Sequence, residues 1–290
     1  MTSAAASDSA EPIVLRTNLV LEADCASVLP RLPAGAFELI YIDPPFNTGV
    51  RRSHRRLAVA RDDDGDRTGF GGHRYRTQAV GETLGYEDRF EDYVAFLRPK
   101  LERARELLAP QGSLYVHLDY REAHYVKVEL DRIFGRDCFL NEIIWAYDYG
   151  AKPTRRWPAK HDTILVYVRN AGEQLFDAEA VEREPYMAPG LVGPQKAARG
   201  KRPTDTWWHT IVPTSGRERT GYPTQKPEGV LRRIVAASSR PGGWCLDFFA
   251  GSGTLGAVCE QLGRRYVLID SSPQAITVMR ARLQATEGAC

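Results

Sequence analysis

The residues of this chain best suited to chemistry are Asp43-Pro44-Pro45-Phe46, which directly follow the apolar run Phe37–Ile42. Such a run predicts a buried strand, and two successive prolines, which cannot donate to a strand ladder, end it. Asp43 and the Pro44 carbonyl can each accept one N–H, and Phe46 can stack on a planar ring. These groups match an exocyclic amino group on a base, although a plain proline-terminated strand would use the same residues.

A second motif, Asp247-Phe248-Phe249-Ala250-Gly251-Ser252-Gly253-Thr254, follows a predicted strand and opens a predicted helix. Its glycines let a ligand approach the backbone, and Ser252 or Thr254 can cap the helix. Asp270 ends the next predicted strand about 20 residues later, where an acid typically accepts the hydroxyls of a ribose. The glycines alone would also suit an ordinary strand-to-helix turn.

The residue types around this turn do not favour a phosphate ligand. A phosphate-binding loop would continue as Gly-Lys-Ser/Thr, which is absent after Gly251, and Asp247 and Asp270 would repel phosphates. The same acids suit an amino group and a sulfonium. The turn therefore predicts a ligand with a ribose and a cationic end, such as S-adenosylmethionine.

Together, Asp-Pro-Pro-Phe and Phe-x-Gly-x-Gly resemble the paired motifs of S-adenosylmethionine-dependent amino-methyltransferases of DNA. The catalytic motif precedes the cofactor motif, as in the permuted β class, in which the target-recognition region lies between the two. Three further stretches resemble the same family: Tyr222-Pro223-Thr224-Gln225-Lys226-Pro227 (with Tyr in place of the usual His), Leu21-Glu22-Ala23-Asp24 and Asp205-Thr206-Trp207-Trp208.

The resemblance implies an α/β, Rossmann-like methyltransferase fold with circularly permuted motif order: a mostly parallel seven-stranded sheet with one antiparallel strand. It implies no metal site. The implied catalytic residues are Asp43, Pro44, Pro45 and Phe46. The implied cofactor-binding residues are Asp24, Thr224, Lys226, Asp247, Phe249, Gly251, Ser252, Gly253, Thr254 and Asp270.

The implied reaction is site-specific methylation of DNA, in which the target base is flipped into a pocket and its amino nitrogen attacks the methyl group in line. Asp in place of Ser at the first motif position, with Phe at the fourth, favours N6 of adenine. Cytosine N4 stays an alternative, because both bases present an amino group next to a ring nitrogen. We assign no role to His117, Asp119 or His161-Asp162, because this chemistry needs no strong base.

Three other functions fit the sequence less well. Enzymes that methylate a protein glutamine or an RNA base usually carry Asn-Pro-Pro-Tyr and the unpermuted order. A catalytically idle DNA-binding protein would not need Asp43, Phe46 and the intact glycine turn. A nicotinamide-dependent oxidoreductase would want Gly-x-Gly-x-x-Gly, which Gly256 completes, but it gives Asp-Pro-Pro-Phe no role.

Alternating strand-like and helical runs predict one doubly wound domain with an insertion. We expect a flexible tail over 1–18, a catalytic half over 19–169 with a mobile basic loop at about 50–82, a target-recognition insertion over 170–221 and a cofactor half over 222–290. The predicted strands are Leu19–Ala23, Phe37–Ile42, Ser113–Leu118, Glu142–Tyr147, Thr163–Val168, Trp244–Phe249 and Arg265–Ile269. The predicted helices are Glu87–Ala109, Arg121–Phe134, Pro227–Ser239, Thr254–Leu262 and Pro273–Gln284.

The net charge is only +2, so a surface for double-stranded DNA must come from local segregation of charge. One cluster comprises Arg51, Arg52, Arg55, Arg56, Arg61, Arg67, Arg74 and Arg76, interrupted by Asp62, Asp63, Asp64 and Asp66. A second comprises Lys196, Arg199, Lys201, Arg202, Arg217 and Arg219. These side chains can contact phosphates or guanine edges, and their types do not separate the two roles.

The five cysteines are scattered without a Cys-x-x-Cys pair, which argues against a disulfide framework and against a zinc site. The N-terminus lacks a signal-peptide core, and no run is long enough to span a bilayer. We therefore expect a cytoplasmic protein with no membrane partner. Members of the resembled family are often dimers, and some act beside a cognate restriction endonuclease; the sequence decides neither.

Overall fold

The computed structural model describes residues 11–49, 52–54, 57–62, 64, 67–68, 73–79, 84–86, 89–150, 153–213 and 216–287. The chain divides into two compact units, one formed by Met1–Phe46 with Asp92–Cys290 and the other by Asn47–Glu91. The predicted motifs all belong to the first unit.

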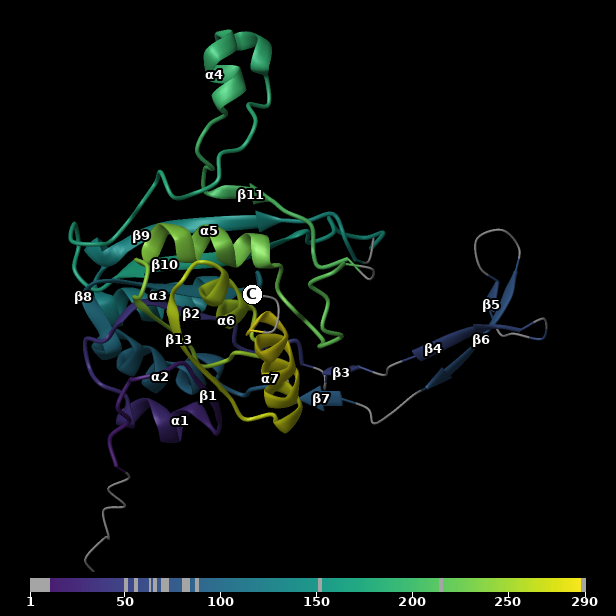
Figure 1. Ribbon diagram of the computed structural model, residues 1–290, viewed down its shortest axis with the longest axis horizontal. Helices are drawn as coiled ribbons and strands as arrows, with labels where there is room; N and C mark the ends of the chain where they lie inside the picture. The colour runs from purple at the N-terminus through teal and green to yellow at the C-terminus, as the bar shows by residue number, and fades with distance from the viewer. Residues whose placement is uncertain are drawn as a thin grey trace, which may run out of the picture. The chain divides into compact units, whose positions relative to one another are not determined.

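The first unit is built on an eight-stranded sheet (Figure 1). In spatial order its strands are β1 (Leu19–Glu22), β13 (Arg265–Asp270), β12 (Trp244–Asp247), β2 (Phe37–Ile42), β8 (Leu108–Leu118), β10 (His161–Val168), β9 (Phe139–Ala146) and β11 (Thr206–Trp208). Only β10 runs antiparallel to its neighbours; the other pairs in this sheet are parallel. The prediction of a mostly parallel sheet with one antiparallel strand is confirmed. The predicted number of strands was one too few, because β11 adds an eighth at the edge.

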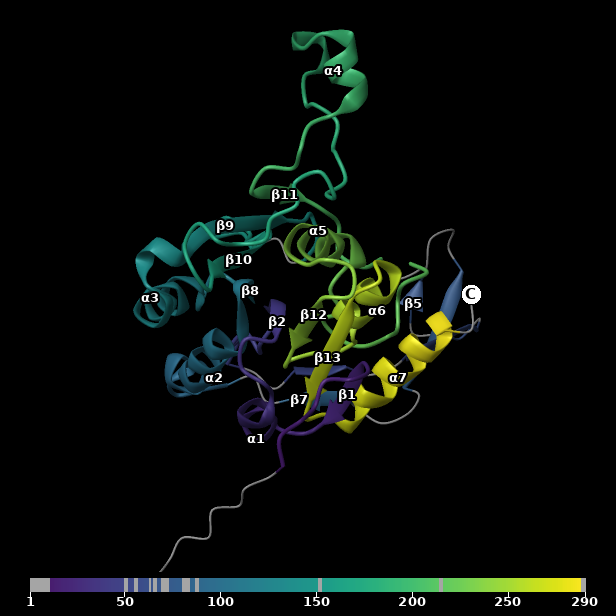
Figure 2. The same cartoon turned by 60° about the vertical axis from the view of Figure 1, so that its left-hand side comes forward.

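Helices cover both faces of this sheet. Figure 2 shows α5 (Glu228–Ser238), α6 (Thr254–Gln261) and α7 (Pro273–Glu287) on one face, and α2 (Tyr93–Leu107) and α3 (Ala123–Phe134) on the other. The short α1 (Cys25–Val28) and the 3₁₀ turn Leu29–Arg31 connect β1 with β2. Because β2 lies in the middle of the sheet, all six of its residues are buried, which explains its near-continuous apolar sequence.

Several predicted boundaries differ from the structure, and the two largest differences have a visible cause or consequence. The helix predicted from Glu87 begins only at Tyr93, because the carboxylate of Asp92 accepts the backbone N–H of Ala95 at 2.8 Å and caps it there. The strand predicted from Ser113 begins at Leu108, where α2 has just ended, so the Pro-Gln-Gly stretch lies inside β8. Residues 87–88 lie outside the described part of the chain.

The second unit contains strands that the sequence analysis did not predict for the basic stretch at about 50–82. Its described residues pair as antiparallel strands: β3 (Arg52–His54) with β7 (Leu84–Tyr86), and β6 (Arg74–Ala79) with both β4 (Leu57–Arg61) and β5 (Arg67–Thr68). Arg76 forms an ion pair with Asp62 at 2.9 Å, so the acids of this stretch neutralise part of its charge. Arg51, Arg55, Arg56, Asp63 and Asp66, like residues 1–10 of the predicted tail, lie outside the described residues.

Neither a membrane span nor a metal cluster occurs in the described part of the chain. No helix there is long and apolar enough to cross a bilayer. No group of three or more His, Cys, Asp or Glu side chains among the same residues is arranged to hold a metal ion. Cys25, Cys138, Cys245 and Cys259 are free thiols, and Cys290 is not described.

The buried acid Glu38 fixes the start of β2. One oxygen of its carboxylate accepts the backbone N–H of Arg240, and the other accepts the Nε–H of the same arginine, both at 2.8 Å. The Glu38 side chain is 11% exposed. Glu38 therefore joins the strand that leads to Asp43 to the loop between α5 and β12.

Glu38→Ala is expected to lower the free energy of unfolding by about 1–3 kcal/mol, because Arg240 loses its acceptors. Urea denaturation measures the loss. Glu102→Ala, which removes an exposed carboxylate from α2, is the control and should change stability by less than about 0.5 kcal/mol. Equal losses in the two variants would contradict a role for the Glu38–Arg240 pair.

Candidate functional site

Four adjacent parallel strands of the sheet each end beside an aspartate. Asp24 follows β1, Asp270 and Asp247 are the last residues of β13 and β12, and Asp43 follows β2. Because these strands lie in the order β1-β13-β12-β2, their carboxyl ends meet along one edge of the sheet, where ligands of open α/β sheets bind. The two predicted motifs, far apart in the sequence, are thus neighbours in the fold.

The glycine turn after β12 is folded around two of these acids. The backbone N–H of Phe249 donates to Asp247 Oδ1 at 2.9 Å, and that of Gly251 donates to Asp270 Oδ2 at 2.8 Å. The other Asp270 oxygen accepts the N–H of Ser272 at 2.9 Å. The half-buried ring of Phe249 contacts Phe96 of α2, with ring centroids 6.2 Å apart. Asp247, Phe249, Gly251 and Asp270 therefore form one structure, as predicted from their spacing.

Burial makes both acids reluctant to ionise. It raises the pKa of Asp247 well above its ordinary value, and the neighbouring charges of Asp43 and Asp270 act in the same direction. Burial also raises the pKa of Asp270, against the hydrogen bonds from Ser272 and Gly251. A cation beside these groups would favour their charged forms, so the electrostatics of the turn suit a positively charged ligand.

The start of α6 differs from the prediction in one respect. Gly253 is the N-cap residue, and no side chain caps the helix there. The hydroxyls of Ser252 and Thr254 instead lie 3.1 Å from each other, and Arg282 of α7 donates to the Thr254 hydroxyl at 3.0 Å and to the Ser252 carbonyl at 3.2 Å. Arg282 thereby fixes the outer side of the turn. No motif in the sequence had pointed to it.

The catalytic motif receives an unexpected partner from the Thr-Gln-Lys-Pro stretch. The ammonium group of Lys226 forms an ion pair with Asp43 Oδ2 and lies over the ring of Phe46, 4.8 Å from its centroid. Asp43 Oδ1 is buried and has no hydrogen-bond partner among the described residues. Pro44 is buried and Pro45 half-buried. Lys226, which the sequence grouped with the cofactor residues, thus contacts the catalytic motif.

The chain around Lys226 is held by hydrogen bonds of its neighbours. The side-chain oxygen of Gln225 accepts the N–H of Thr220 at 2.8 Å, and its amide group donates to the carbonyl of Glu218 at 2.6 Å. The hydroxyl of Thr254 donates to the Lys226 carbonyl at 3.1 Å, which joins this stretch to the glycine turn. Thr224 is exposed and has a φ of +60°, an uncommon conformation for a β-branched residue.

Asp24, the remaining predicted cofactor residue, is exposed at the end of β1. One oxygen of its carboxylate accepts the N–H of Ala26 at 2.9 Å and caps α1. The N–H of Ala23 donates to the Asp270 carbonyl at 3.1 Å, so the chain at Asp24 runs beside the end of β13.

A buried polar network that the sequence left without a role lies beside Phe46. His117 of β8 is fully buried, with Nδ1 2.8 Å from the Tyr41 hydroxyl and Nε2 3.1 Å from Asp162 Oδ2. Its ring centroid is 6.0 Å from that of Phe46. Tyr147 donates to the other oxygen of Asp162 at 3.0 Å. The available signal was His117 inside one predicted strand and Asp162 directly before another.

This network contains an ionised carboxylate. Burial alone would raise the pKa of Asp162, but the hydrogen bond from His117 and the charge of Lys226 bring it below its ordinary value. Burial, with help from the charge of Asp43, raises the pKa of Tyr41 well above its ordinary value, so the Tyr41 hydroxyl stays a donor. Asp119, next along the same edge, accepts the backbone N–H of its neighbour Arg121 at 2.9 Å.

The predicted insertion over 170–221 carries α4 (Pro194–Arg199), which stands away from the sheet beyond β11 (Figure 1). Two of its six predicted basic residues are neutralised: Lys201 by Glu184 at 3.1 Å and Arg202 by Glu179. The other four, Lys196, Arg199, Arg217 and Arg219, have exposed side chains.

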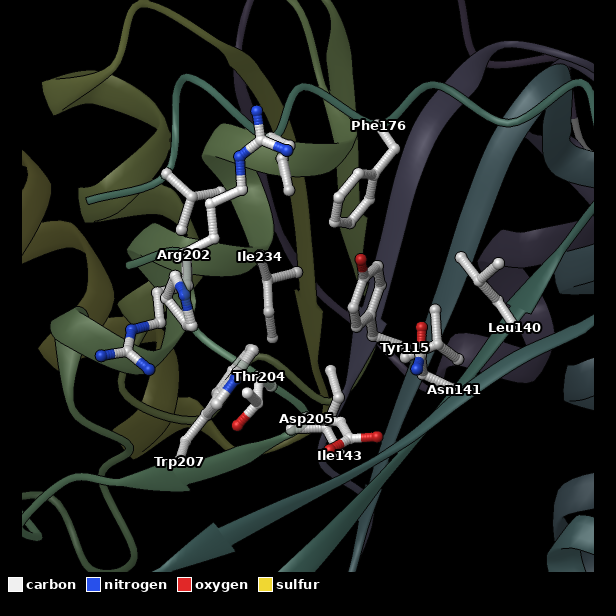
Figure 3. Close-up of a pocket in the computed structure, with 16 residues that line it drawn as sticks. Tyr115, Leu140, Asn141, Ile143, Phe176, Arg202, Thr204, Asp205, Trp207 and Ile234 are labelled. Carbon is white, nitrogen blue, oxygen red and sulfur yellow. Dashed lines mark hydrogen bonds between the residues drawn. The ribbon is translucent and has the colours of Figure 1, made fainter. Parts of the chain in front are cut away.

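The base of this insertion covers a cavity of about 470 Å³ between the sheet and α5. Figure 3 shows Phe176, Arg202 and Trp207 of the insertion lining it together with Tyr115 of β8 and Ile234 of α5. The residues that line it include none of the predicted catalytic or cofactor-binding residues. The cavity is therefore separate from the row of aspartates.

Comparison with known proteins decides the family. A family model described as DNA methylase matches residues 37–281, which include the catalytic motif, the glycine turn and nearly all of the sheet. The chain belongs to the DNA methylase family. The methyl donor of this family is S-adenosylmethionine.

Two relatives and one solved structure illustrate the similarity of this methylase to other proteins. The chain is 31% identical over 209 residues to the type II methyltransferase M.HpaI of Haemophilus parainfluenzae, a match that covers 71% of this chain and 65% of M.HpaI. It is 28% identical over 272 residues to the DNA adenine methyltransferase YhdJ of Escherichia coli (strain K12), covering 91% of this chain and 82% of YhdJ. The chain thus spans slightly less than two thirds of M.HpaI.

The solved structure is that of the PvuII DNA methyltransferase, which is cytosine-N4-specific. It matches with a TM-score of 0.63 and 14% identity, over 92% of this chain and 86% of that chain. At this identity the likeness is one of fold.

Substitution of Gly253 tests how tightly the methylase packs its glycine turn. Gly253 has a φ of +71°, and a Cβ there would lie 2.7 Å from Met279 Cγ. Gly263 has a φ of +69°, and a Cβ at that position would meet nothing within 4 Å. Gly263→Ala should lower the free energy of unfolding by about 1–2 kcal/mol, because of backbone strain alone. Gly253→Ala should lower it by about 1–3 kcal/mol more, because the added Cβ overpacks against Met279. Thermal unfolding compares the two; equal losses would show that the Met279 contact carries no cost.

Proposed function

We propose that this protein transfers the methyl group of S-adenosylmethionine to the exocyclic N6 amino group of adenine at specific sites in double-stranded DNA. The observation that carries the proposal is Asp43 Oδ1, which is buried and has no hydrogen-bond partner among the described residues, at the strand end next to the glycine turn. The Lys226 ammonium contacts both Asp43 and the ring of Phe46. The catalytic motif therefore offers an acceptor and a stacking surface at one place.

The residues along the row of aspartates fit S-adenosylmethionine. Two acids whose pKa values are raised by burial favour a ligand that brings positive charge, and glycine is the residue type that lets a ligand approach the backbone closely. When bound, the cofactor supplies an electrophilic methyl group carried on a sulfonium. Asp270 would accept the ribose hydroxyls and Asp24 the adenine amino group. The rest of the proposed cofactor site comprises Thr224, Asp247, Phe249, Gly251, Ser252, Gly253 and Thr254, whereas the Lys226 side chain contacts the catalytic motif.

A base that is stacked and paired in a duplex hides its amino group, so the enzyme must flip the nucleotide out at a cost of a few kcal/mol. The ring of Phe46 replaces part of the lost stacking. The amino nitrogen is a poor nucleophile because its lone pair is delocalised into the base. Asp43 and the Pro44 carbonyl would accept its two N–H bonds and stabilise the positive charge that develops on it. No covalent intermediate is required.

The choice of base rests on residue types and on one relative. Asp43 in the first position of the motif and Phe46 in the fourth favour adenine, and the matched relative YhdJ is named as an adenine enzyme. Cytosine N4 is the second candidate, because the family includes enzymes of that type and one fold neighbour is cytosine-N4-specific.

The surface that reads the DNA sequence is proposed to be the insertion over 170–221. Its exposed basic residues Lys196, Arg199, Arg217 and Arg219 are the candidates for contact with phosphates and base edges. Action on cellular DNA would place the protein in the cytoplasm. A homodimer and a cognate restriction endonuclease stay predictions about its partners.

Single-molecule sequencing of DNA from a methylation-free host that expresses the protein tests the function. The expected product is N6-methyladenine within one recurring sequence. N4-methylcytosine alone, confirmed by mass spectrometry of the nucleosides, would reject adenine. Absence of any modified base, with a folded protein that binds S-adenosylmethionine, would reject methylation of DNA.

Two substitutions should separate the two halves of the site. Asp43→Ala is expected to lower the methylation rate at least about 100-fold, because an acceptor for the developing charge is lost, and to leave the affinity for S-adenosylmethionine nearly unchanged. Asp270→Asn should weaken cofactor binding by about 10-fold or more, which is about 1.4 kcal/mol. Calorimetry and single-turnover methylation measure both. An Asp43→Ala variant as active as the parent would undermine the assignment.

A further inference from the structure

The carboxylate of Asp43 has two oxygens in different situations. Oδ2 is engaged by the ammonium of Lys226, whereas Oδ1 is buried and lacks a partner among the described residues. A buried carboxylate oxygen without a donor is costly, and it is an unused acceptor. Because a base amino group needs an acceptor for its N–H, the free oxygen is the one suited to receive it.

Lys226 is held where this pairing requires it. Its side chain is 11% exposed and that of Asp43 is 17% exposed, so water screens the pair only in part. The Lys226 carbonyl accepts the Thr254 hydroxyl at 3.1 Å, and α5 begins two residues later, at Glu228. The ammonium also lies over the Phe46 ring, 4.8 Å from its centroid. One side chain therefore contacts both the acceptor and the stacking surface.

The charges around this pair explain why a cation is needed. Asp247 from the end of β12 and the ionised Asp162 from β10 both interact with Lys226, and Asp247 also interacts with Asp43. The charge of Asp43 also acts on Tyr41 of β2, which stays protonated because burial raises its pKa well above the ordinary value. Three carboxylates share one ammonium. Without it, their mutual repulsion would favour protonation, and a protonated Asp43 could present a donor to the base in place of an acceptor.

We infer that Lys226 is a positioning residue of the methyl-transfer site: its ammonium holds Asp43 through Oδ2, keeps that carboxylate an acceptor, and leaves Oδ1 for the amino group of the base. The inference rests on the proposed function. It gives Lys226 a role toward the substrate that is distinct from binding the cofactor.

The test compares Lys226→Met and Lys226→Arg with Lys127→Met, in the full-length protein. Lys127 is the matched control, because it also pairs with an aspartate, Asp131 at 2.8 Å, but lies in α3 on the other side of the sheet from α5. Calorimetry gives the affinity for S-adenosylmethionine, and single-turnover kinetics give the methylation rate and the KM for DNA from about pH 6 to about pH 9.

Lys226→Met should bind S-adenosylmethionine within about 3-fold of the parent and methylate about 100-fold more slowly at neutral pH, a loss of about 2.7 kcal/mol. The acid limb of its pH–rate profile should move to higher pH, so that the deficit shrinks as the pH rises. Lys226→Arg, which keeps the charge, should keep the acid limb of the parent. Lys127→Met should match the parent throughout.

A Lys226→Met variant that loses cofactor affinity but keeps the pH profile would make Lys226 a cofactor ligand and overturn the inference. So would a rate and profile equal to those of the parent. A double-mutant cycle with Asp43→Asn adds a second criterion: if Lys226 acts through Asp43, the two losses must not add, and full additivity contradicts the role. The proposed function fails separately, if the parent protein itself does not methylate DNA.

Discussion

The close approach of like charges is the constraint on which the rest of this site depends. Parallel strands in the order β1-β13-β12-β2 bring four aspartates to one edge, and burial gives two of them raised pKa values. Such a row is tolerable only if backbone N–H groups and cations face it. The turns around Asp247 and Asp270 provide the N–H groups, and Lys226 provides a cation next to Asp43. The charge that the chain leaves uncompensated is what a sulfonium cofactor can supply.

The spatial order of the strands also explains how a chain with permuted motif order can form this site. Asp43 and Lys226 are 183 positions apart, yet their side chains meet, and the hydroxyl of Thr254 joins the Lys226 stretch to the glycine turn. What the fold requires is the spatial order of the strands. A permuted chain can satisfy it because β2 and β12 lie side by side whichever is made first.

Much of the fold could be predicted because local pattern and tertiary position agree. Phe37–Ile42 is apolar because it is buried on both faces, and its predicted bounds are those of β2. The prediction failed where another part of the chain decides the outcome. β11 has only three residues and is a strand because it pairs with β9, and α2 begins where Asp92 can cap it. The predicted site residues gather at one edge of the sheet. The contact of Lys226 with Asp43 and the buried His117–Asp162 pair could not be predicted, because each joins residues far apart in the sequence and no local motif encodes it.

The insertion that carries α4 is closed at its base. Glu184 and Lys201 exchange both backbone hydrogen bonds at 2.8 Å, and β11 then continues the sheet beside β9. The segment of the insertion between Glu184 and Lys201 therefore leaves and rejoins the fold at one fixed point. Its length and sequence can therefore diverge at little cost in loop entropy, while the strand register and the row of aspartates stay as they are. On the proposed role of this insertion in reading the DNA sequence, a new target requires only a new segment between Glu184 and Lys201, and the strand ends that carry the aspartates stay unchanged.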